Sequence, residues 1–375
     1  MKIGIFAFRQ APYISANTAI AYTIGEELSK EHQVVYIGRK QAENQNNVLL
    51  YHGSSIRHLN DQPKPEWTRT QNYLMRFNQY RIALSADIRA LRRIVREESI
   101  DAIVCITAPN ENAMIVALSN LSIPIVLLQL DPFYNGMDQE NPRLKKQFCR
   151  LARRFRHVFT TDLLIETYRA EPKLAKVINR FSVAQFPKLI RPVIDSEKTV
   201  GKERILLYTG SLYSGIRNPD IMIRLQFVLP EHCQLVFCGG CDRKEDYMKL
   251  AAAGIRCMGY LPQERLATVV SKADCLLNIG NAVRNQLGSK LIDYLATGKP
   301  ILNLYQLEDC PTKHVLKNYG NHLDIAVETI EESGNRISDF LKFSAGKTLP
   351  WEEIEQNYRM YTPEFVAEQI LETIQ

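Results

Sequence analysis

The chain has 375 residues, of which 45% are hydrophobic and 23% are charged. This composition is typical of folded globular proteins and excludes a disordered, collagen-like or low-complexity chain. The length exceeds what one hydrophobic core usually serves and suits two domains. No apolar run approaches the roughly 20 residues that span a bilayer, and the apolar stretch from Ile3 to Phe8 is too short for a signal peptide. We therefore expect a cytoplasmic protein.

The net charge of +6 is modest, but the basic residues are concentrated in two places. Residues 67–97 contain seven arginines against Asp87 and Glu97. Residues 141–157 contain no acidic residue and seven basic ones, Arg143, Lys145, Lys146, Arg150, Arg153, Arg154 and Arg156. The basicity is therefore local, which indicates contact with an anionic surface rather than a generally basic protein.

The eight cysteines are spread over the chain. Scattered cysteines in a large chain are typical of buried thiols and not of a disulfide framework. Cys238-Gly-Gly-Cys241 has the spacing of a zinc or redox pair, but no second pair follows it. The two glycines also stand where an apolar strand has to turn. We favour that plain turn and predict no metal site.

Strand and helix patterns alternate through the first half of the chain. The predicted strands are residues 2–8, 34–37, 101–106, 124–128 and 158–160, and the predicted helices are residues 18–30, 81–98, 111–119 and 143–156. Strands separated by helices imply right-handed crossovers and a parallel, doubly wound sheet.

Residues 186–203 interrupt this alternation with prolines, mixed charges and no periodicity, and we interpret them as a linker. Predicted strands at 204–208, 234–238, 256–258, 275–278 and 300–303 then alternate with helices near 219–228, 243–253, 263–271 and 289–297. The sequence predicts an α/β protein with two tandem Rossmann-like domains, residues 1–185 and 204–350, whose doubly wound parallel sheets face a cleft. Residues 351–375 follow as C-terminal helices. Ligands of such sheets bind beyond the carboxyl ends of the strands.

The strongest local signal is the segment 285–300, NQLGSKLIDYLATGKP. Gly288 and Ser289 stand just before a predicted helix, whose exposed amides attract phosphate. Lys290 is a cation in the first turn, where the helix dipole disfavours it, so an anionic ligand would explain its presence. Asp293 lies one turn later and could reach ribose hydroxyls. An ordinary capped helix with a solvated lysine and aspartate is the alternative.

A second candidate loop, residues 208–219, follows the first strand of the second domain. It contains Gly210, Ser211 and Arg217, and the next helix begins near Pro219, as helix starts prefer. Backbone amides and one guanidinium form a natural clamp for a diphosphate. Glycine-rich loops also occur simply to turn the chain, which is the alternative reading.

Five features of residues 204–305 together resemble the donor domain of retaining glycosyltransferases of the family 4 type, which have the glycosyltransferase-B architecture. These features are the Gly210–Arg217 loop, Leu235–Gly240, Gly259-Tyr260-Leu261-Pro262 with Glu264, Ala273-Asp274 before a strand, and the 285–300 segment. Over residues 1–183 only the overall pattern carries the resemblance. It further implies that residues 351–375 cross back onto the first domain.

The resemblance implies a donor site made of Gly210, Ser211, Tyr260, Leu261, Asn285, Gly288, Ser289 and Asp293. Asp293 matches the family's second acid, which holds the nucleotide ribose. Asn285 replaces the first acid, which contacts the donor sugar. The family's arginine and lysine diphosphate pair falls on Ser211 and Arg217, so Lys290 is expected to supply the second cation.

The same resemblance places Tyr260 and Leu261 against the nucleobase and requires neither a metal nor another cofactor. Arg217 and Lys290 are expected to act in catalysis by neutralising the departing nucleoside diphosphate. The acceptor hydroxyl would attack from the face that the diphosphate leaves. A phosphate oxygen of the donor would take its proton, so a protein base need not be present.

Loops after the N-terminal strands are expected to bind the acceptor. Asp131, which follows an apolar strand, is the best candidate for a polar catalytic contact, although a turn aspartate before proline explains it equally well. Arg9 and Asn17 flank the loop after the first strand and are placed on the acceptor side. A surface arginine and a helix cap are the alternatives for these two.

Apolar residues recur at helical spacing in residues 143–157, at Leu144, Phe148, Leu151 and Phe155, with basic residues on the remaining faces. Residues 67–80 add aromatic and apolar side chains beside Arg69 and Arg76. Such mixtures suit the headgroup region of a membrane. We expect the first domain to dock peripherally on the anionic inner face of the membrane. The alternative is a stripe packed on the sheet beneath a solvated basic face.

The sequence thus predicts a metal-independent, retaining glycosyltransferase of the polysaccharide or glycoconjugate type. Its co-substrate would be a nucleoside diphosphate sugar, and its acceptor a hydroxyl group, expected on a lipid-linked saccharide. A non-catalytic sugar- or partner-binding subunit of the same fold is the alternative. A nucleotide-sugar epimerase is disfavoured because no matching acid and histidine set is found in the first half. No nucleic-acid-binding motif is recognised.

Overall fold

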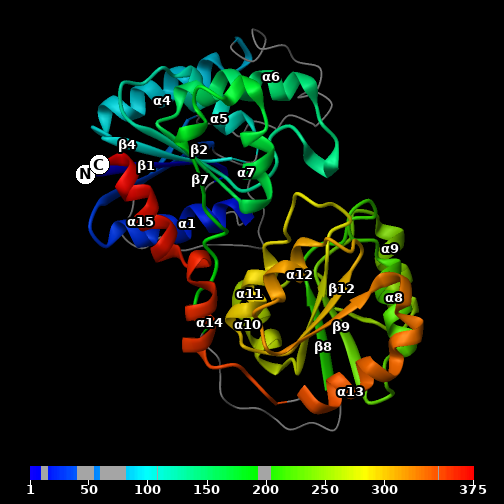
Figure 1. Cartoon of the computed structure of the whole chain (residues 1–375). Coiled ribbons are helices and arrows are strands. Elements are labelled where there is room, and N and C mark those ends of the chain that lie inside the picture. Colours follow the sequence, from blue (N-terminus) through cyan, green and yellow to red (C-terminus); the bar gives the residue numbers. More distant parts are fainter. Residues whose placement is uncertain (10–15, 40–54, 60–81, 108, 193–203, 345) are drawn as a thin grey trace. The chain divides into compact units, whose positions relative to one another are not determined.

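The computed structural model describes the chain except residues 10–15, 40–54, 60–81, 108, 193–203 and 345, and the side chains of Phe8, Arg9 and Ala16. The chain forms two compact units (Figure 1). Unit 1 comprises Met1–Lys188 together with Met360–Gln375, and unit 2 comprises Leu189–Arg359. The chain therefore passes between the units twice.

Unit 1 is built on a seven-stranded sheet in the order β3-β2-β1-β4-β5-β6-β7. Its strands are β1 (Lys2–Arg9), β2 (Gln33–Arg39), β3 (Ser55–His58), β4 (Ala102–Ile106), β5 (Ile125–Gln129), β6 (His157–Thr160) and β7 (Phe181–Val183). All neighbouring strands pair in parallel. The order reverses between β1 and β4, as in a doubly wound sheet.

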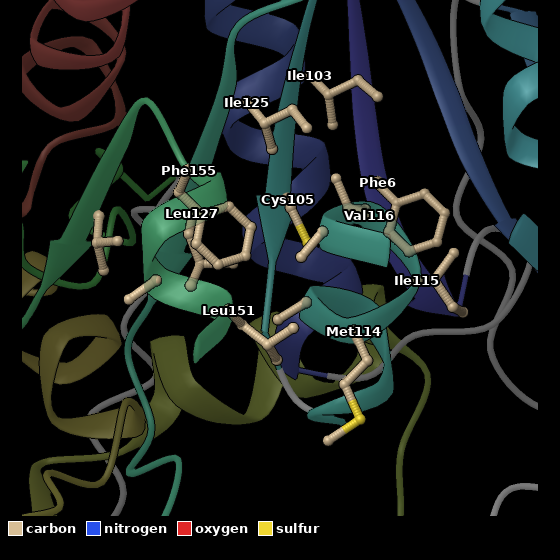
Figure 2. Close-up of a cluster of buried hydrophobic side chains, with 14 of the residues drawn as sticks. Phe6, Ile103, Cys105, Met114, Ile115, Val116, Ile125, Leu127, Leu151 and Phe155 are labelled. Carbon is tan, nitrogen blue, oxygen red and sulfur yellow. The ribbon is translucent and has the colours of Figure 1, made fainter. Parts of the chain in front are cut away.

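Helices cover both faces of this sheet (Figure 1). On one face, α1 (Ala16–Ser29) packs against α15 (Pro363–Ile374). On the other face, α4 (Ser85–Glu97), α5 (Glu111–Leu118) and α6 (Pro142–Leu151) form one hydrophobic cluster with the strands. Figure 2 shows Cys105 of β4 and Leu127 of β5 directed at the side chains of α5 and at Phe155. The central strands are apolar along their interior because both faces are buried, and polar residues stand only at their ends.

Unit 2 is built on a six-stranded parallel sheet in the order β10-β9-β8-β11-β12-β13. Its strands are β8 (Arg204–Thr209), β9 (Cys233–Cys238), β10 (Arg256–Cys257), β11 (Cys275–Ile279), β12 (Ile301–Tyr305) and β13 (His322–Ala326). Its helices are α8 (Asp220–Val228), α9 (Lys244–Ala252), α10 (Gln263–Lys272), α11 (Lys290–Ala296), α12 (Pro311–Leu316), α13 (Gly334–Ser344) and α14 (Trp351–Tyr358). The order reverses between β8 and β11, so the loops after these strands diverge. The predicted pair of doubly wound parallel sheets is confirmed.

The two C-terminal helices belong to different units. In α14, the Tyr358 hydroxyl donates a hydrogen bond to the Val315 carbonyl of unit 2, at 2.9 Å. In α15, the Gln369 amide donates to the Val183 carbonyl at the end of β7, at 3.4 Å. Only α15 therefore returns to unit 1. Much of the predicted linker lies outside the described residues.

The basic segment 141–157 forms α6 and the short helix η2 (Ala152–Arg154). Its apolar stripe packs inward, with Phe148, Leu151 and Phe155 buried. Lys145 is bound by Glu140 and by the buried carboxylate of Glu171, with N–O distances of 2.8 and 2.6 Å. The exposed basic side chains are those of Arg143, Lys146, Arg150, Arg153, Arg154 and Arg156. Lys145 is therefore corrected from a surface contact to a structural ion pair.

The aromatic part of the predicted membrane face, residues 67–80, lies outside the described residues. In the portion of the chain that is described, no helix combines the length and apolarity needed to cross a membrane.

Candidate functional site

The predicted donor residues come together at the carboxyl ends of β8 and β11, which are neighbours in the sheet of unit 2. Gly210 follows β8, and a Cβ added there would lie 3.7 Å from Cγ of Lys290, at the start of α11. A Cβ added at Gly288 would lie 3.9 Å from Nη1 of Arg217. The loop after β8 and the first turn of α11 therefore place two cations beside two glycines.

Arg217 is held by a tight turn and by two tyrosines. Its backbone N–H donates to the Tyr213 carbonyl at 2.7 Å, and its guanidinium carbon lies 5.7 Å from the centre of the Tyr213 ring. Nη1 donates to the Tyr208 hydroxyl at 3.3 Å. Nε is buried and has no hydrogen-bond partner. Among the residues that the structure describes, no carboxylate forms an ion pair with Arg217, so this partly buried cation suits an anionic ligand.

Tyr208, at the end of β8, is the buried support of this guanidinium. Burial raises the pKa of its hydroxyl above the ordinary value, although the neighbouring charge of Arg217 acts in the opposite direction. The hydroxyl therefore stays neutral at physiological pH and leaves the positive charge of Arg217 uncompensated.

Lys290 and Asp293, one turn apart on α11, form an ion pair with an N–O distance of 3.1 Å. Their side chains are 41% and 31% exposed, so the pair is partly solvated and a ligand can separate it. Ser289 has helical backbone angles and makes no side-chain cap hydrogen bond, so it does not cap this helix as a serine before a helix commonly does. The Leu291 and Ile292 N–H groups instead donate to the Gly288 and Ser289 carbonyls, at 3.1 and 3.2 Å.

Tyr294, also on α11, fixes the helix to the end of β8. Its hydroxyl accepts a hydrogen bond from the Thr209 N–H at 2.7 Å and lies 3.0 Å from the Thr209 hydroxyl. The side chain is buried, and burial raises the pKa of its hydroxyl. Tyr294 could not be distinguished in the sequence from the other residues on the inner face of this helix.

Gln306, after β12, fastens the two loops to each other. Its amide donates to the Ile216 carbonyl at 2.7 Å and to the Gly280 carbonyl at 2.6 Å. Asn281 shapes the loop between β11 and α11 by donating to the Gln286 carbonyl at 2.8 Å. Asn285, the predicted sugar contact, is buried in this same loop.

The loop after β9 gives both glycines of the Cys238-Gly-Gly-Cys241 motif a steric role. A Cβ at Gly239 would lie 1.8 Å from the Gly210 carbonyl oxygen, and one at Gly240 would lie 2.7 Å from the Tyr260 ring. Burial raises the pKa of both cysteine thiols to about 11, which disfavours the thiolate that zinc or redox chemistry needs. In the described parts of the chain, no group of three metal-binding side chains occurs.

Tyr260 lies at the rim of the same loops. Its side chain is 69% exposed, and its hydroxyl lies 2.8 Å from the Ser211 hydroxyl, within hydrogen-bond distance. The next residue, Leu261, is partly exposed. The structure thus brings the predicted base-side and phosphate-side residues to one edge of the sheet.

No protein-family model and no curated protein matches this sequence. Solved structures do match over the whole chain. The lipopolysaccharide outer core galactosyltransferase WaaB, in its apo form, is 12% identical with a TM-score of 0.62, and the match covers 100% of this chain and 99% of that one. HepE of Anabaena, in complex with UDP and glucose, is 13% identical with a TM-score of 0.69, covering 100% and 99%. This chain has the glycosyltransferase-B fold.

The glycosyltransferase-B fold is the architecture that the sequence predicted. The fold alone does not name a reaction. A structure titled as a putative UDP-N-acetylglucosamine 2-epimerase from Listeria monocytogenes is also similar, with 14% identity, a TM-score of 0.61 and coverage of 100% and 95%. The assignment to the retaining family 4 subtype stays a prediction.

The acceptor-side predictions lie in unit 1 of this glycosyltransferase-B fold. Asp131 follows β5 and is partly exposed, and its carbonyl accepts a hydrogen bond from the Gln129 amide at 3.3 Å. Asn17 lies in the first turn of α1 and is partly exposed. Arg9 is the last residue of β1, and its side chain lies outside the described part.

Sequence reasoning missed two buried polar residues at this edge of the sheet. Gln129 and Thr160 are the last residues of β5 and β6 and face each other in register. Both are fully buried, and Oε1 of Gln129 and Oγ1 of Thr160 have no hydrogen-bond partner. The sequence signal that could have identified them is a polar residue at the end of an apolar strand.

Proposed function

We propose that the protein transfers a sugar from a nucleoside diphosphate sugar to a hydroxyl acceptor. The observation that carries this proposal is Arg217, a partly buried guanidinium with an unpartnered Nε and no carboxylate counter-charge among the described residues. Because Gly288 has no side chain, the backbone lies close to this guanidinium, and a Cβ added there would be 3.9 Å from Nη1 of Arg217. A diphosphate supplies the two negative charges and the acceptor oxygens that this arrangement lacks.

In this proposal each donor residue contacts one part of the nucleotide sugar. Arg217 and Lys290 bind the diphosphate with the amides near Gly210, Ser211, Gly288 and Ser289. Asp293 accepts hydrogen bonds from the ribose hydroxyls once Lys290 turns to the phosphate. Tyr260 and Leu261 pack on the nucleobase, and Asn285 contacts the sugar. The UDP complexes of HepE support a nucleotide at this fold's site.

The proposed reaction replaces one carbon–oxygen bond by another. The bond between the anomeric carbon and the β-phosphate oxygen breaks, and the acceptor oxygen bonds to the same carbon from the same face, with retention. The acceptor proton passes to an oxygen of the departing diphosphate. Arg217 and Lys290 stabilise the charge that develops on that group, so the chemistry calls on no metal ion or other cofactor.

The acceptor side of the proposal rests on unit 1. Asp131 is proposed to accept a hydrogen bond from the acceptor hydroxyl, with Asn17 and Arg9 as further contacts. The exposed arginines and lysine of α6 and η2 support docking on the inner, anionic face of a membrane, where a lipid-linked saccharide would be met.

The direct test measures release of nucleoside diphosphate from a panel of nucleotide sugars and binding of each nucleotide by calorimetry. Arg217→Ala is expected to weaken nucleotide binding by about 2 kcal/mol, because a charge-assisted hydrogen bond is lost. Arg336→Ala, an exposed arginine on α13, is the matched control and should change nothing. Equal nucleotide affinity in wild type and Arg217→Ala would refute the site.

The epimerase alternative is favoured by one observation, the similarity to the Listeria structure. An epimerase would invert a sugar carbon and return a nucleoside diphosphate sugar as its product, without an acceptor. A transferase releases nucleoside diphosphate and needs an acceptor. A non-catalytic subunit would bind the nucleotide sugar through the same residues and release nothing. Product analysis by mass spectrometry and NMR separates the three.

The metal requirement gives a separate prediction. Since two cations of the chain itself face the leaving group in this proposal, turnover should survive an excess of EDTA. Loss of turnover in EDTA that returns on adding magnesium or manganese would contradict this part of the proposal and leave the donor site intact.

A further inference from the structure

A pocket of about 390 Å³ lies in unit 1 at the amino ends of β5, β6 and β7. This is the opposite edge of the sheet from the carboxyl ends that carry the acceptor-side predictions. Three arginines line it: Arg154 at the end of η2, Arg156 just before β6, and Arg180 just before β7. The segment Ser122–Ile125 and the chain end Ile374–Gln375 form most of the remaining lining, and the Phe155 and Ile374 side chains there are buried.

The arginines are positioned by neutral groups. Nη1 of Arg154 donates to the Asn120 amide oxygen at 2.5 Å, and Nη1 of Arg180 donates to the Phe155 carbonyl at 3.2 Å. The Arg156 backbone N–H donates to the Ile125 carbonyl at 2.8 Å, which fixes the start of its side chain at the rim. Each guanidinium keeps further N–H donors for a ligand.

The positive charge of this pocket is only partly compensated. Within the described part of the chain, none of the three guanidinium groups forms an ion pair with a carboxylate, that of Gln375 included. The contrast is local, because nearby Lys145 and Arg169 both have glutamate partners. The positive charge of Arg156 also acts on His157. Burial lowers the pKa of His157, and the charge of Arg156 lowers it further.

The last turn of α15 ends at the pocket, with Ile374 and Gln375 in its lining. The helix C-terminus carries about half a negative charge and the terminal carboxylate of Gln375 carries one more, so together they offset about half of the three positive charges. Three guanidinium groups around one concave space instead match the several oxygens of a tetrahedral anion.

We propose that this pocket binds the phosphate group of a phosphate ester through Arg154, Arg156 and Arg180. The shared chemistry is a phosphate mono- or diester, carried by a small soluble molecule or by a lipid headgroup. This inference does not depend on the donor site, which lies in the other unit.

The test uses the full chain and three probes: inorganic phosphate, soluble dihexanoyl phosphatidylglycerol, and phosphatidylglycerol vesicles. Binding is followed by calorimetry for the soluble probes and by co-sedimentation for vesicles. The test variant combines Arg154→Gln, Arg156→Gln and Arg180→Gln, and the matched control combines Arg169→Gln, Arg265→Gln and Arg336→Gln. Arg217→Ala is measured in parallel, because the proposed donor site could also take up phosphate.

Wild type, the control and Arg217→Ala should bind dihexanoyl phosphatidylglycerol alike, and the triple pocket variant should lose about tenfold in affinity, or 1.4 kcal/mol. Arg156→Gln alone should lose about threefold, about 0.65 kcal/mol, which keeps the test valid if the triple variant fails to fold. Binding of inorganic phosphate with the same variant pattern would identify the phosphate group alone as sufficient. Binding confined to the lipid probes would identify a headgroup.

Undiminished binding in the pocket variants, or no binding of any probe by wild type, would overturn the inference. Loss of soluble-probe binding in Arg217→Ala with full retention in the pocket variants would also overturn it and would assign the phosphate to unit 2. Neither result would bear on the transferase assay, so the two proposals fail independently.

Discussion

Lys290 and Asp293 neutralise each other across 3.1 Å, while Arg217 nearby has no acidic partner among the described residues. The proposed site therefore contains one cation that is ready for an anion and one that must first leave a carboxylate. Removing the Asp293 carboxylate should therefore have opposite effects on the binding of the diphosphate part of a nucleotide and on the binding of its ribose.

Asp293→Asn should strengthen binding of inorganic pyrophosphate, because Lys290 is released from its ion pair, and should weaken binding of nucleoside diphosphate through the ribose. We expect each change to be about 1 kcal/mol. Lys290→Met serves as the counterpart and should weaken both ligands. Calorimetry measures the affinity of each variant for the two ligands. If Asp293→Asn changed both affinities in the same direction, the roles assigned to Lys290 and Asp293 would be wrong.

Two adjacent glycines should respond very differently to the same substitution. At Gly239 the added Cβ would meet a backbone oxygen at 1.8 Å, and the backbone has φ +156°, so the strand ends would have to separate. At Gly240 it would meet the far end of the exposed Tyr260 ring, which can swing away. Gly239→Ala should destabilise by about 3 kcal/mol or more and Gly240→Ala by about 1 kcal/mol or less.

Thermal or urea unfolding of the two variants measures this difference. Gly240→Ala should still displace Tyr260 from Ser211, and a tyrosine fluorescence or nucleotide-binding change at unaltered stability would report that movement. Similar unfolding midpoints for both variants would mean that the contact between the loops after β8 and β9 is not as tight as described.

At the scale of elements, the interior strands and their helices could be predicted because burial on both faces leaves an apolar run bounded by turn residues. The edge strands β3 and β13 and the short β7 were missed. β13 is only five residues long, from His322 to Ala326, with Ile325 as its one buried residue, and its register is defined by pairing with the distant strand β12. No local pattern carries that information.

The candidate site likewise contains residues that could be predicted from the sequence and residues that could not. Glycines and charges in loops after strands are visible in sequence, since parallel sheets place such loops at one edge. The contributions of Tyr294 and Gln306 could not be predicted, because their partners are Thr209, Ile216 and Gly280, distant in sequence. Which residue fills such a role depends on the tertiary packing.

Edge strand β13 is tied to the sheet by a polar ladder. The Asn278 amide donates to the Asn303 oxygen, and the Asn303 amide donates to Asp324, both at 2.7 Å. His322 lies 3.6 Å from the other oxygen of Asp324. The interaction with Asp324 raises the pKa of His322 above its ordinary value, although burial opposes it.

A raised pKa in the folded state means that protonated His322 stabilises the fold. This contribution should be complete below about pH 6.5, the unfolded value, and should disappear as the pH rises through the folded pKa. His322→Gln should therefore lower the urea midpoint at pH 6 and have little effect at pH 8. An equal loss at both pH values would show that packing rather than charge anchors β13.

For the whole molecule, the exposed basic residues of α6 and η2 predict salt-sensitive binding to anionic vesicles, because each basic residue near such a surface contributes about 1 kcal/mol before screening. Wild type should co-sediment with phosphatidylglycerol vesicles at low salt and dissociate as the ionic strength rises. The test variant combines Lys146→Glu, Arg150→Glu and Arg153→Glu, all outside the arginine pocket.

The control for this experiment changes the net charge equally in unit 2, by Arg265→Glu, Lys272→Glu and Arg336→Glu. It should bind vesicles as wild type does, whereas the α6 variant should not. An equal loss of vesicle binding in both variants would show that overall charge causes the effect. Retained vesicle binding in the α6 variant would show that the docking surface lies elsewhere.

The return of α15 to unit 1 has a consequence for how the protein is made. Val366 and Ile370 of this helix are fully buried against α1 and β5, so unit 1 lacks part of its core until the final residues exist. A ribosome adds roughly 5–20 residues per second, and it must synthesise all of unit 2 before α15 appears. The first unit to begin folding is thus the last to be completed, with an apolar surface that chaperones can bind in the interval.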